Sequence, residues 1–405
     1  MAEKKYVPKV RFFQFDSDWK EHLVGDLLIE RVDLTPKSNE YPLMAFVANQ
    51  GIVPKGERYD RSALVTDAEN KLYKKTEYGD FIYSSNNLES GSIGLNKYGK
   101  ATISPVYSIF SPTEFGVSSF LGRRLVRSDF IKEMIKWRQG VVYGQWRIHE
   151  SDFEKIIVKV PNVDEQAKIG IFLQQIDSLI IDSQKKLEKL QVLKSGMLKK
   201  MFPKVGADVP EIRFKGYTEA WNCHRLKDIV QPYSDPVHTP DDGYFRLGIR
   251  SHGKGTFHSF VAPGMGLETA QMHRVKENNL ILNITFAWEH AVAITNEADR
   301  GKLVSHRFPQ FKFNDNMLPR FFKYAILDDR FRHHLWLASP GGAGRNRVLK
   351  IEEMLKYKFW VPETLEEQGK IANYFDRLTE MTELLQQELI KLQHLKKALF
   401  EKMFI

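Results

Sequence analysis

One stretch of this chain occurs twice, and the repeat limits what the chain can fold into. Residues 165–202 read EQAKIGIFLQQIDSLIIDSQKKLEKLQVLKSGMLKKMF, and residues 367–404 read EQGKIANYFDRLTEMTELLQQELIKLQHLKKALFEKMF. The two copies align without a gap at an offset of 202 residues, and 14 of their 38 positions are identical. Unrelated sequences of average composition would share roughly two or three. The chain therefore contains an internal duplication.

Both copies have the apolar periodicity of a long helix. Apolar residues recur every seven positions in the same register in each copy, with Ser183 as the polar exception, and no proline interrupts either copy. A seven-residue repeat over four heptads predicts a coiled-coil seam, and 38 helical residues span about 57 Å. The predicted seam consists of Ile169, Ile176, Leu190, Met197, Ile371, Leu378, Leu385, Leu392 and Leu399.

A helix with such a seam needs a partner. The other copy in the same polypeptide is present at high effective concentration, which favours pairing within the chain. A coiled coil that joins two chains is the alternative. If the segments before each helix fold into similar heads at opposite ends of the pair, the helices must run antiparallel.

The duplication extends beyond the helices. Residues 7–12 read VPKVRF and residues 209–214 read VPEIRF, and Trp19 matches Trp221 at the same offset. The chain is therefore expected to comprise a first head (1–160), a first helix (161–203), a second head (204–361) and a second helix (362–405).

Each head is predicted to be α+β, because short apolar runs alternate with Gly-, Asn- and Ser-rich connections. We expect strands at 43–47, 81–83, 101–110, 156–160, 244–249, 280–285, 291–295 and 302–313, and helices at 120–137 and 318–337; residues 7–15 should form a strand or an extended arm. The head interiors differ, as SSNNLES (84–90) against NITFAWE (283–289) shows. A shared frame with unlike interiors is expected of two copies of one binding module that have different targets.

Composition and charge narrow the class of protein. The 405 residues carry a net charge of +9, which suits a nucleic-acid partner, and contain one cysteine, which excludes a disulfide framework. No apolar run approaches 18 residues and the N-terminus is polar and basic, so no membrane segment or signal peptide is expected. These features predict a cytoplasmic protein.

Several motifs come close to enzyme signatures without matching them. GLNKYGKA (94–101) lacks the Ser or Thr of a phosphate-binding loop, so a turn before a strand is expected. QPYS (231–234) departs from the motif of amino-methyltransferases, and the Asp and Glu residues do not form a nuclease-like set. The histidines lack metal-site spacing. No catalytic or metal-binding residue is predicted.

Two weak signals for DNA contact recur in both heads. A segment rich in Gly and Arg precedes the last strand of each head, at 140–147 and 341–347, and basic residues populate the loops. Glycine allows a backbone to approach a phosphate, and arginine contacts phosphates or guanine. The candidate DNA contacts are Lys55, Arg58, Arg61, Arg123, Arg124, Arg147, Arg246, Arg250, His252, Lys254, Arg345 and Arg347. Tight loops with solvated arginines remain the alternative.

The arrangement resembles the specificity subunit (HsdS) of Type I restriction–modification systems. The resemblance covers the whole chain and rests on the alternation of unlike heads with like helices. It also rests on the Pro…Glu-Gln entry at Pro161, Glu165 and Gln166, repeated at 362–368, on the Lys-Met-Phe ends at 200–202 and 402–404, and on the Pro-x-x-Arg-Phe…Trp openings.

The resemblance implies a subunit without catalysis of its own. Two target recognition domains, separated by a pair of long antiparallel coiled-coil helices, would each read one half of a bipartite, asymmetric double-stranded DNA target. The helices would set the spacing and dock two methylation (M) subunits, with restriction/translocase (R) subunits joining the complex. S-adenosylmethionine, ATP and magnesium would be held by those partners, and no membrane would be involved.

The expectation that the helices set the spacing between half-sites also has a physical basis. Heads that read the same side of DNA lie about one helical turn, or about 34 Å, apart, which a pair of helices about 57 Å long can accommodate. Deleting one helical turn from each helix, near Gln184 and Gln386, should reduce the number of base pairs between the two half-sites. The alternatives are a DNA-binding nuclease with an unrecognised site in one head, and a scaffold without DNA affinity.

Overall fold

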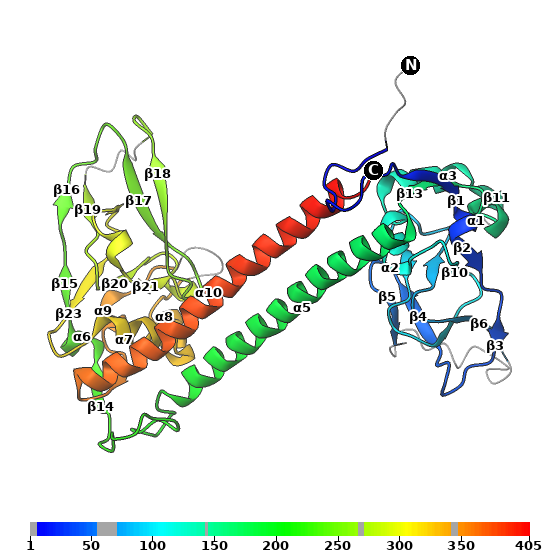
Figure 1. The fold of residues 1–405 in the computed structure, drawn as a ribbon. Helices are drawn as coiled ribbons and strands as arrows, with labels where there is room; N and C mark the ends of the chain where they lie inside the picture. The colour runs from blue at the N-terminus through cyan, green and yellow to red at the C-terminus, as the bar shows by residue number, and fades with distance from the viewer. Residues whose placement is uncertain (1–5, 55–70, 142–144, 266–270, 342–346) are drawn as a thin grey trace. The chain divides into compact units, whose positions relative to one another are not determined.

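The computed structural model describes residues 6–54, 71–141, 145–265, 271–341 and 347–405. The chain divides into two compact units, Met1–Gln184 with Glu388–Ile405, and Lys185–Gln387. Unit 1 contains the first head, and unit 2 contains the second head. Two helices of 38 residues, α5 (Val163–Lys200) and α10 (Leu365–Lys402), each contribute one part to each unit (Figure 1).

The first head is built on a four-stranded sheet with strand order β2-β10-β7-β8. A three-stranded sheet β3-β6-β9 and three two-stranded pairs, β1-β13, β4-β5 and β11-β12, complete it. Its elements are β1 Lys20–Leu23, α1 Val24–Leu27, β2 Leu28–Glu30, β3 Leu34–Thr35, β4 Met44–Val47, β5 Gly51–Pro54, β6 Tyr73–Thr76, β7 Phe81–Tyr83, β8 Ile93–Leu95, β9 Ala101–Ile103, β10 Ser108–Pro112, α2 Ser118–Arg124, α3 Ser128–Lys136, β11 Gln139–Val141, β12 Gln145–Arg147, α4 Glu150–Phe153 and β13 Ile157–Val160.

The second head repeats the four-stranded sheet as β15-β23-β20-β21. Its two-stranded pair β14-β24 repeats β1-β13 of the first head. Its other sheet is different, with five strands in the order β16-β19-β22-β17-β18. Its elements are β14 Asn222–Arg225, α6 Leu226–Ile229, β15 Val230–Tyr233, β16 Pro236–Val237, β17 Tyr244–Ile249, β18 Thr256–Val261, β19 Met272–Arg274, β20 Asn279–Leu282, η4 Ala287–Glu289, β21 Val292–Ile294, η5 Glu297–Asp299, β22 Leu303–Val304, β23 Gln310–Phe313, α7 Pro319–Ala325, α8 Asp329–Leu337, α9 Ile351–Met354 and β24 Lys358–Val361. The predicted α+β class is confirmed, and the heads share one sheet while differing in the other.

The two long helices run antiparallel in each unit. In unit 1 the start of α5, at Ile169 and Ile176, packs in one core with the end of α10, at Leu392 and Leu399. In unit 2 the start of α10 packs with the end of α5 in the same way. Of the predicted seam, Ile169, Ile176, Ile371 and Leu378 are buried, Leu190, Met197, Leu392 and Leu399 are partly buried against these cores, and Leu385 is partly buried outside them.

An ion pair anchors the start of each long helix. Arg11 donates from Nε and Nη2 to the Glu165 carboxylate at 2.7 and 2.6 Å, and Glu165 is fully buried. Arg213 donates to Glu367 in the same way, at 2.7 and 2.9 Å. A bidentate pair satisfies both charges, which a buried carboxylate requires. This contact explains why the Arg-Phe opening and the Glu-Gln entry occur together.

The neighbouring glutamine ties each helix to its head. The Gln166 amide accepts a hydrogen bond from the Val117 backbone N–H and donates to the carbonyls of Phe115 and Pro161. Gln368 makes the equivalent bonds to residues 316, 318 and 362. Both glutamines are buried, so each fixes the direction in which a long helix leaves its head.

The Met-Phe end of each long helix packs into a head. Phe404 lies against Trp19, with ring centroids 6.4 Å apart, and against Phe120, at 5.3 Å. Phe202 packs on Trp221 and Phe321 at 6.0 and 5.5 Å. The opening tryptophan and the closing phenylalanine of the repeat thus belong to one buried aromatic cluster per unit.

Several predicted elements are divided in the structure. The helix expected at 120–137 is two helices, α2 and α3, separated at Leu125–Arg127, and the helix expected at 318–337 is α7 and α8. The strands expected at 101–110 and 302–313 are each interrupted by a turn. The opening segment contains no strand in its described part, and Val10 N–H donates to the Lys402 carbonyl. In the described part of the chain, no helix is long and apolar enough to cross a membrane.

Candidate nucleic-acid interface

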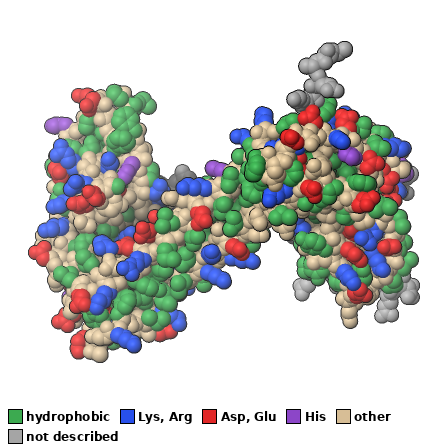
Figure 2. Space-filling model, in the orientation of Figure 1, with side chains coloured by type: hydrophobic (Ala, Val, Ile, Leu, Met, Phe, Trp, Pro, Cys, Tyr) green, Lys and Arg blue, Asp and Glu red, His purple; other side chains and the backbone are tan. Residues whose placement is uncertain are grey.

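A two-stranded hairpin in unit 2 combines exposed aromatic and basic side chains. Strands β17 and β18 pair over six residues each, and β18 lies at the edge of its sheet (Figure 1). Phe245, Phe257 and Phe260 are 51%, 40% and 57% exposed, which is unusual for phenylalanine. Figure 2 shows hydrophobic side chains exposed among Lys and Arg side chains over this part of the unit. Such a surface suits stacking and phosphate contact together.

Aromatic side chains lie on both faces of the hairpin, with Phe245 and Phe260 on one face and Phe257 on the other, and basic side chains lie beside them. Phe257 lies opposite Gly248, where an added Cβ would come within 2.3 Å of the Phe257 ring. Arg250 lies over this ring at 5.2 Å, and Lys302 lies over Phe245 at 4.9 Å. These cation–π contacts orient the basic groups while leaving the aromatic rings partly exposed. Gly248 therefore makes room for a side chain that faces outward.

The turn of the hairpin docks on the short helix η4. His252 has a positive φ of 63°, and its N–H donates to the Glu289 carbonyl at 2.8 Å, while Gly253 N–H donates to the His290 carbonyl at 2.9 Å. His290 also has a positive φ, and its Nε2 lies 2.8 Å from the Ile326 carbonyl. Left-handed backbone at non-glycine residues is kept where surrounding contacts enforce it.

Two hollows meet at this turn. The first, of about 490 Å³, is lined by His252, Trp288, Glu289, Arg332, His333 and Trp336. The second, of about 400 Å³, includes Arg246, Phe257, Phe286 and Glu289 in its lining. Arg347 lies over the rings of Trp336 and Trp288, at 4.7 and 5.8 Å. Aromatic walls with cationic side chains beside them are what single bases or base edges require.

The structure thus brings part of the predicted set together in unit 2. Arg250, His252 and Lys254 lie on the hairpin turn, Arg246 lies on β17, and Arg347 lies beside the first hollow. Arg345 lies outside the described residues. Sequence reasoning missed Trp288, Trp336 and Arg332. The interleaving of aromatic and basic residues from Phe245 to Phe260 was the available signal for the hairpin.

Unit 1 presents a smaller counterpart. Arg147 and Trp146 lie on β12, and their exposed side chains belong to the Gly- and Arg-containing segment that the sequence singled out. Arg147 lies 3.5 Å from Glu150, and Trp146 N–H donates to the Asn86 side chain. Lys55, Arg58 and Arg61 lie outside the described residues.

Two arginines of unit 1 that were predicted to contact DNA form ion pairs within the chain instead. Arg123 pairs with Asp177 of α5 at 2.6 Å, and Arg124 is buried and pairs with Asp129 at 3.0 Å. Burial lowers the pKa of Arg124 from its ordinary value. These contacts favour a role in attaching α2 to its surroundings over a role at a DNA surface.

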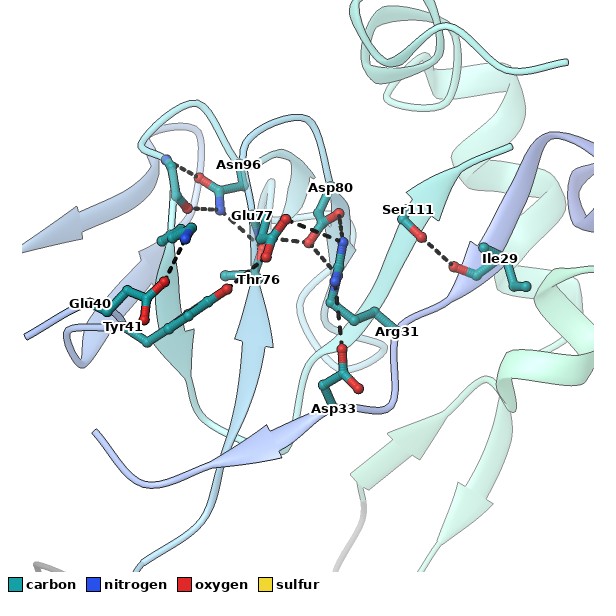
Figure 3. Close-up of polar contacts among 12 residues, drawn as sticks. Ile29, Arg31, Asp33, Glu40, Tyr41, Thr76, Glu77, Asp80, Asn96 and Ser111 are labelled. Carbon is teal, nitrogen blue, oxygen red and sulfur yellow. Dashed lines mark hydrogen bonds and ion pairs between the residues drawn. The ribbon is translucent and has the colours of Figure 1, made fainter. Parts of the chain in front are cut away.

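A polar network in unit 1 joins the strands of the first head (Figure 3). Arg31 Nε pairs with Asp80 at 2.9 Å, and Asp80 accepts the Glu77 backbone N–H at 2.7 Å. Tyr41 donates to Glu77 at 2.7 Å, and Asn96 donates to Thr76 at 3.0 Å. Burial raises the pKa of Asp80. The Arg31 guanidinium is paired with carboxylates of the same head, so the network has the character of a structural contact.

The near-match to a phosphate-binding loop is a turn, as expected. Asn96 Oδ1 accepts the backbone N–H groups of Tyr98 and Gly99, and β8 and β9 flank the turn. Two backbone donors of this turn are thus already used within the loop. Among the residues that the structure describes, no group of three or more His, Cys, Asp or Glu side chains could hold a metal ion.

Comparison with known proteins shows what the second head and the long helix after it resemble. Residues 252–394 match the family model of the Type I restriction modification DNA specificity domain, a range that includes the turn, both tryptophans and α8. Residues 252–394 are thus similar to the DNA specificity domain of Type I restriction–modification systems. The match begins within the second head and extends into α10, so it spans the head-to-helix junction that the repeat defines.

The proteins that resemble this chain are distant from it in sequence. The Type I restriction enzyme MjaVIII specificity subunit of Methanocaldococcus jannaschii is 23% identical over 294 residues, which is 68% of this chain and 66% of that protein. The S subunit of a Type I restriction–modification system from M. genitalium has a TM-score of 0.57 at 12% identity, with 98% of this chain and 99% of that chain covered. The HsdS subunit from Thermoanaerobacter tengcongensis has a TM-score of 0.44 at 17% identity, covering 95% and 96% of the two chains. The M. genitalium structure supports the fold.

Proposed function

We propose that this chain supplies DNA sequence specificity to a Type I restriction–modification complex. Each head would read one half of a bipartite, asymmetric double-stranded target. The observation that carries the proposal is the contrast between the heads. They share a four-stranded sheet and the contacts at the start of each long helix, but they differ in the second sheet. In unit 2 that second sheet holds the exposed Phe and Arg side chains. Unlike surfaces on a common frame suit two unlike half-sites.

The proposed partners follow from the family and from the helices. The antiparallel helices would set the distance between half-sites and dock two methylation subunits, and restriction/translocase subunits would join them. Val192, Leu384 and Ile390 are exposed apolar side chains on these helices, 73%, 59% and 45% accessible. We propose that catalysis, together with S-adenosylmethionine, ATP and magnesium, belongs to the partner subunits. A nuclease site in one head has no support from the comparisons.

Selection from a library of random duplexes tests the proposal. The full chain with its cognate methylation subunit should enrich duplexes that share two short, unlike blocks separated by unread base pairs. The logarithm of its affinity should fall linearly with the logarithm of the salt concentration, because phosphate contacts release counterions. Enrichment of no shared sequence would contradict the proposal.

Phe257→Ala and Arg250→Ala offer a variant-level test, with Lys227→Ala on α6 of the same unit as the control. Phe257 and Arg250 lie together on the hairpin, whereas Lys227 is exposed away from it. The hairpin variants should bind the selected duplex about tenfold or more weakly, since base stacking and guanidinium contacts are each worth about 1–3 kcal/mol. Equal affinities for all three variants would remove the hairpin from the interface.

A further inference from the structure

One carboxylate lies in the middle of the basic, aromatic surface of unit 2. Glu289 lines both hollows, and it is the only acidic side chain among the residues that line them. Arg332, His252 and His333 line the first hollow with it, and Arg246 lines the second. An acidic group at a surface that faces phosphates weakens binding by repulsion. Its position therefore needs an explanation that phosphate contact does not supply.

The Glu289 side chain is held in place. Ser251 Oγ donates to Glu289 Oε2 at 2.7 Å. The backbone is fixed on both sides, because the Glu289 carbonyl accepts His252 N–H at 2.8 Å and Glu289 N–H donates to the Phe286 carbonyl at 3.0 Å. The next residue, His290, is buried in left-handed conformation. A fixed acceptor can recognise a donor without first losing conformational freedom.

Among the described residues, no basic side chain forms an ion pair with the Glu289 carboxylate. In the parts of the chain that the structure describes, Glu289 forms no salt bridge, and the Ser251 hydroxyl is its one side-chain hydrogen-bond partner. This differs from Asp299 in the same head, whose carboxylate is buried and meets His258 Nε2 at 2.8 Å and Thr256 Oγ1 at 2.9 Å. Asp299 has a structural set of partners, whereas Glu289 keeps Oε1 for a ligand.

We infer that Glu289 is a specificity-determining residue that accepts a hydrogen bond from an exocyclic amino group of a base. This inference rests on the proposed function. Cytosine N4 and adenine N6 present such donors in the major groove, which is also wide enough for a two-stranded ribbon such as β17–β18. The amino donor offsets the repulsion from phosphates only at the correct base. Glu289 therefore selects one base pair in the half-site that unit 2 reads.

The test compares target sequences selected by three forms of the full chain with its cognate methylation subunit: the wild type, Glu289→Ala, and Glu297→Gln as a matched control. Glu297 is an exposed carboxylate of η5 in the same head that lines neither hollow. Glu289→Ala should lose its preference at one position of one half-site and leave the other half-site unchanged. Glu297→Gln should select the wild-type target.

Base analogues identify the hydrogen bond itself. At the position that loses its preference, purine replaces adenine, or 2-pyrimidinone replaces cytosine, so that only the amino group is removed. The wild type should bind this duplex about tenfold to a hundredfold more weakly than the unmodified one. Glu289→Ala should bind the two duplexes equally. Ser251→Ala, which frees the carboxylate to rotate, should give a smaller loss of discrimination.

Two results would overturn the inference, and they are distinguishable. An unchanged consensus for Glu289→Ala, or equal sensitivity of wild type and variant to the analogue, removes Glu289 from base reading and leaves the proposed function standing. A wild-type complex that selects no sequence contradicts the proposed function, and the inference falls with it. Thermal unfolding of Glu289→Ala at the wild-type temperature separates loss of recognition from loss of folding.

Discussion

The Arg11–Glu165 ion pair at the start of α5 contributes to the stability of unit 1. The carboxylate is fully buried and the Arg11 side chain is 10% exposed, and the hydrogen bond that Arg11 donates to Glu165 raises the pKa of Arg11. We expect Arg11→Ala to destabilise unit 1 by about 3–5 kcal/mol, because it leaves a buried charge without a partner. Thermal unfolding measures the change.

The matched variants for this ion pair are Lys9→Ala and the double variant Arg11→Met with Glu165→Gln. Lys9 is exposed and close in sequence, so its loss should change the free energy of unfolding by less than about 0.5 kcal/mol. The double variant removes both charges and should be more stable than Arg11→Ala alone. Unfolding of Arg11→Ala at the wild-type temperature would contradict a stabilising role for this ion pair.

His290 makes the stability of unit 2 depend on pH. Burial lowers the pKa of His290 below its ordinary value of 6.5. Below pH 6.5 the unfolded chain therefore binds more protons than the folded one, and stability falls as the pH is lowered. His290→Asn tolerates the left-handed backbone and does not titrate in this range. Urea unfolding at pH 7.5 and 5.5 should show a larger loss of stability for the wild type, by up to about 1.4 kcal/mol per pH unit.

The control for His290 is His306→Asn, because His306 is exposed in the same head. This variant should keep the pH dependence of the wild type. If the His290→Asn chain loses as much stability on acidification as the wild type does, the buried histidine is not the cause.

The candidate interface shows what residue-level sequence reasoning can and cannot supply. Arg250 and His252 were predicted as DNA contacts in a loop of the second head, and the structure places both on the hairpin turn. Arg123 and Arg124 had equally suggestive sequence contexts but have Asp177 and Asp129 as partners. Composition does not reveal which arginine has a carboxylate beside it in three dimensions. That information comes from packing between elements far apart in the chain.

At the scale of elements, the long helices were the most predictable part. A seam sustained over 38 residues predicts a helix and its length, and α5 and α10 begin and end within two residues of the repeat. The shorter helices were less predictable. The apolar spacing of residues 120–137 continues across Leu125–Arg127, but the chain leaves the helix there because Arg127 is extended and starts α3. Periodicity does not register a single change of backbone direction.

Two glycines of α5 give an element-scale prediction. Gly196 has open space where a Cβ would lie, so Gly196→Ala should stabilise the helix by about 0.5–1 kcal/mol. Gly170 packs against α2, and its added Cβ would lie 2.0 Å from Ser119 Oγ and 3.2 Å from Phe120 N. Gly170→Ala should therefore be destabilising. Thermal unfolding of the two variants should shift in opposite directions, and a shift in the same direction would contradict the packing of α5 on α2.

At the scale of the whole molecule, the proposed spacing between half-sites depends on the length of both helices. Removing residues 181–187 and 383–389 takes one heptad from each helix and keeps the seam in register, with a rotation of about 20°. The loss of about 10.5 Å corresponds to about three base pairs. We expect the selected target to keep both half-sites with a gap about three base pairs shorter. A deletion in one helix alone mismatches the seam and should destabilise the chain.

The central claim is that each head reads its own half of the target, and a head exchange tests it most directly. Residues 24–155 are replaced by the corresponding segment of a Type I specificity subunit, which leaves β1, β13 and the Arg11–Glu165 ion pair in place. Sequencing of modified adenines in cells that carry the complete system then gives the recognised sequence. We expect one half-site to change while the other half-site and the gap stay the same. A change in both half-sites, or in neither, would contradict it.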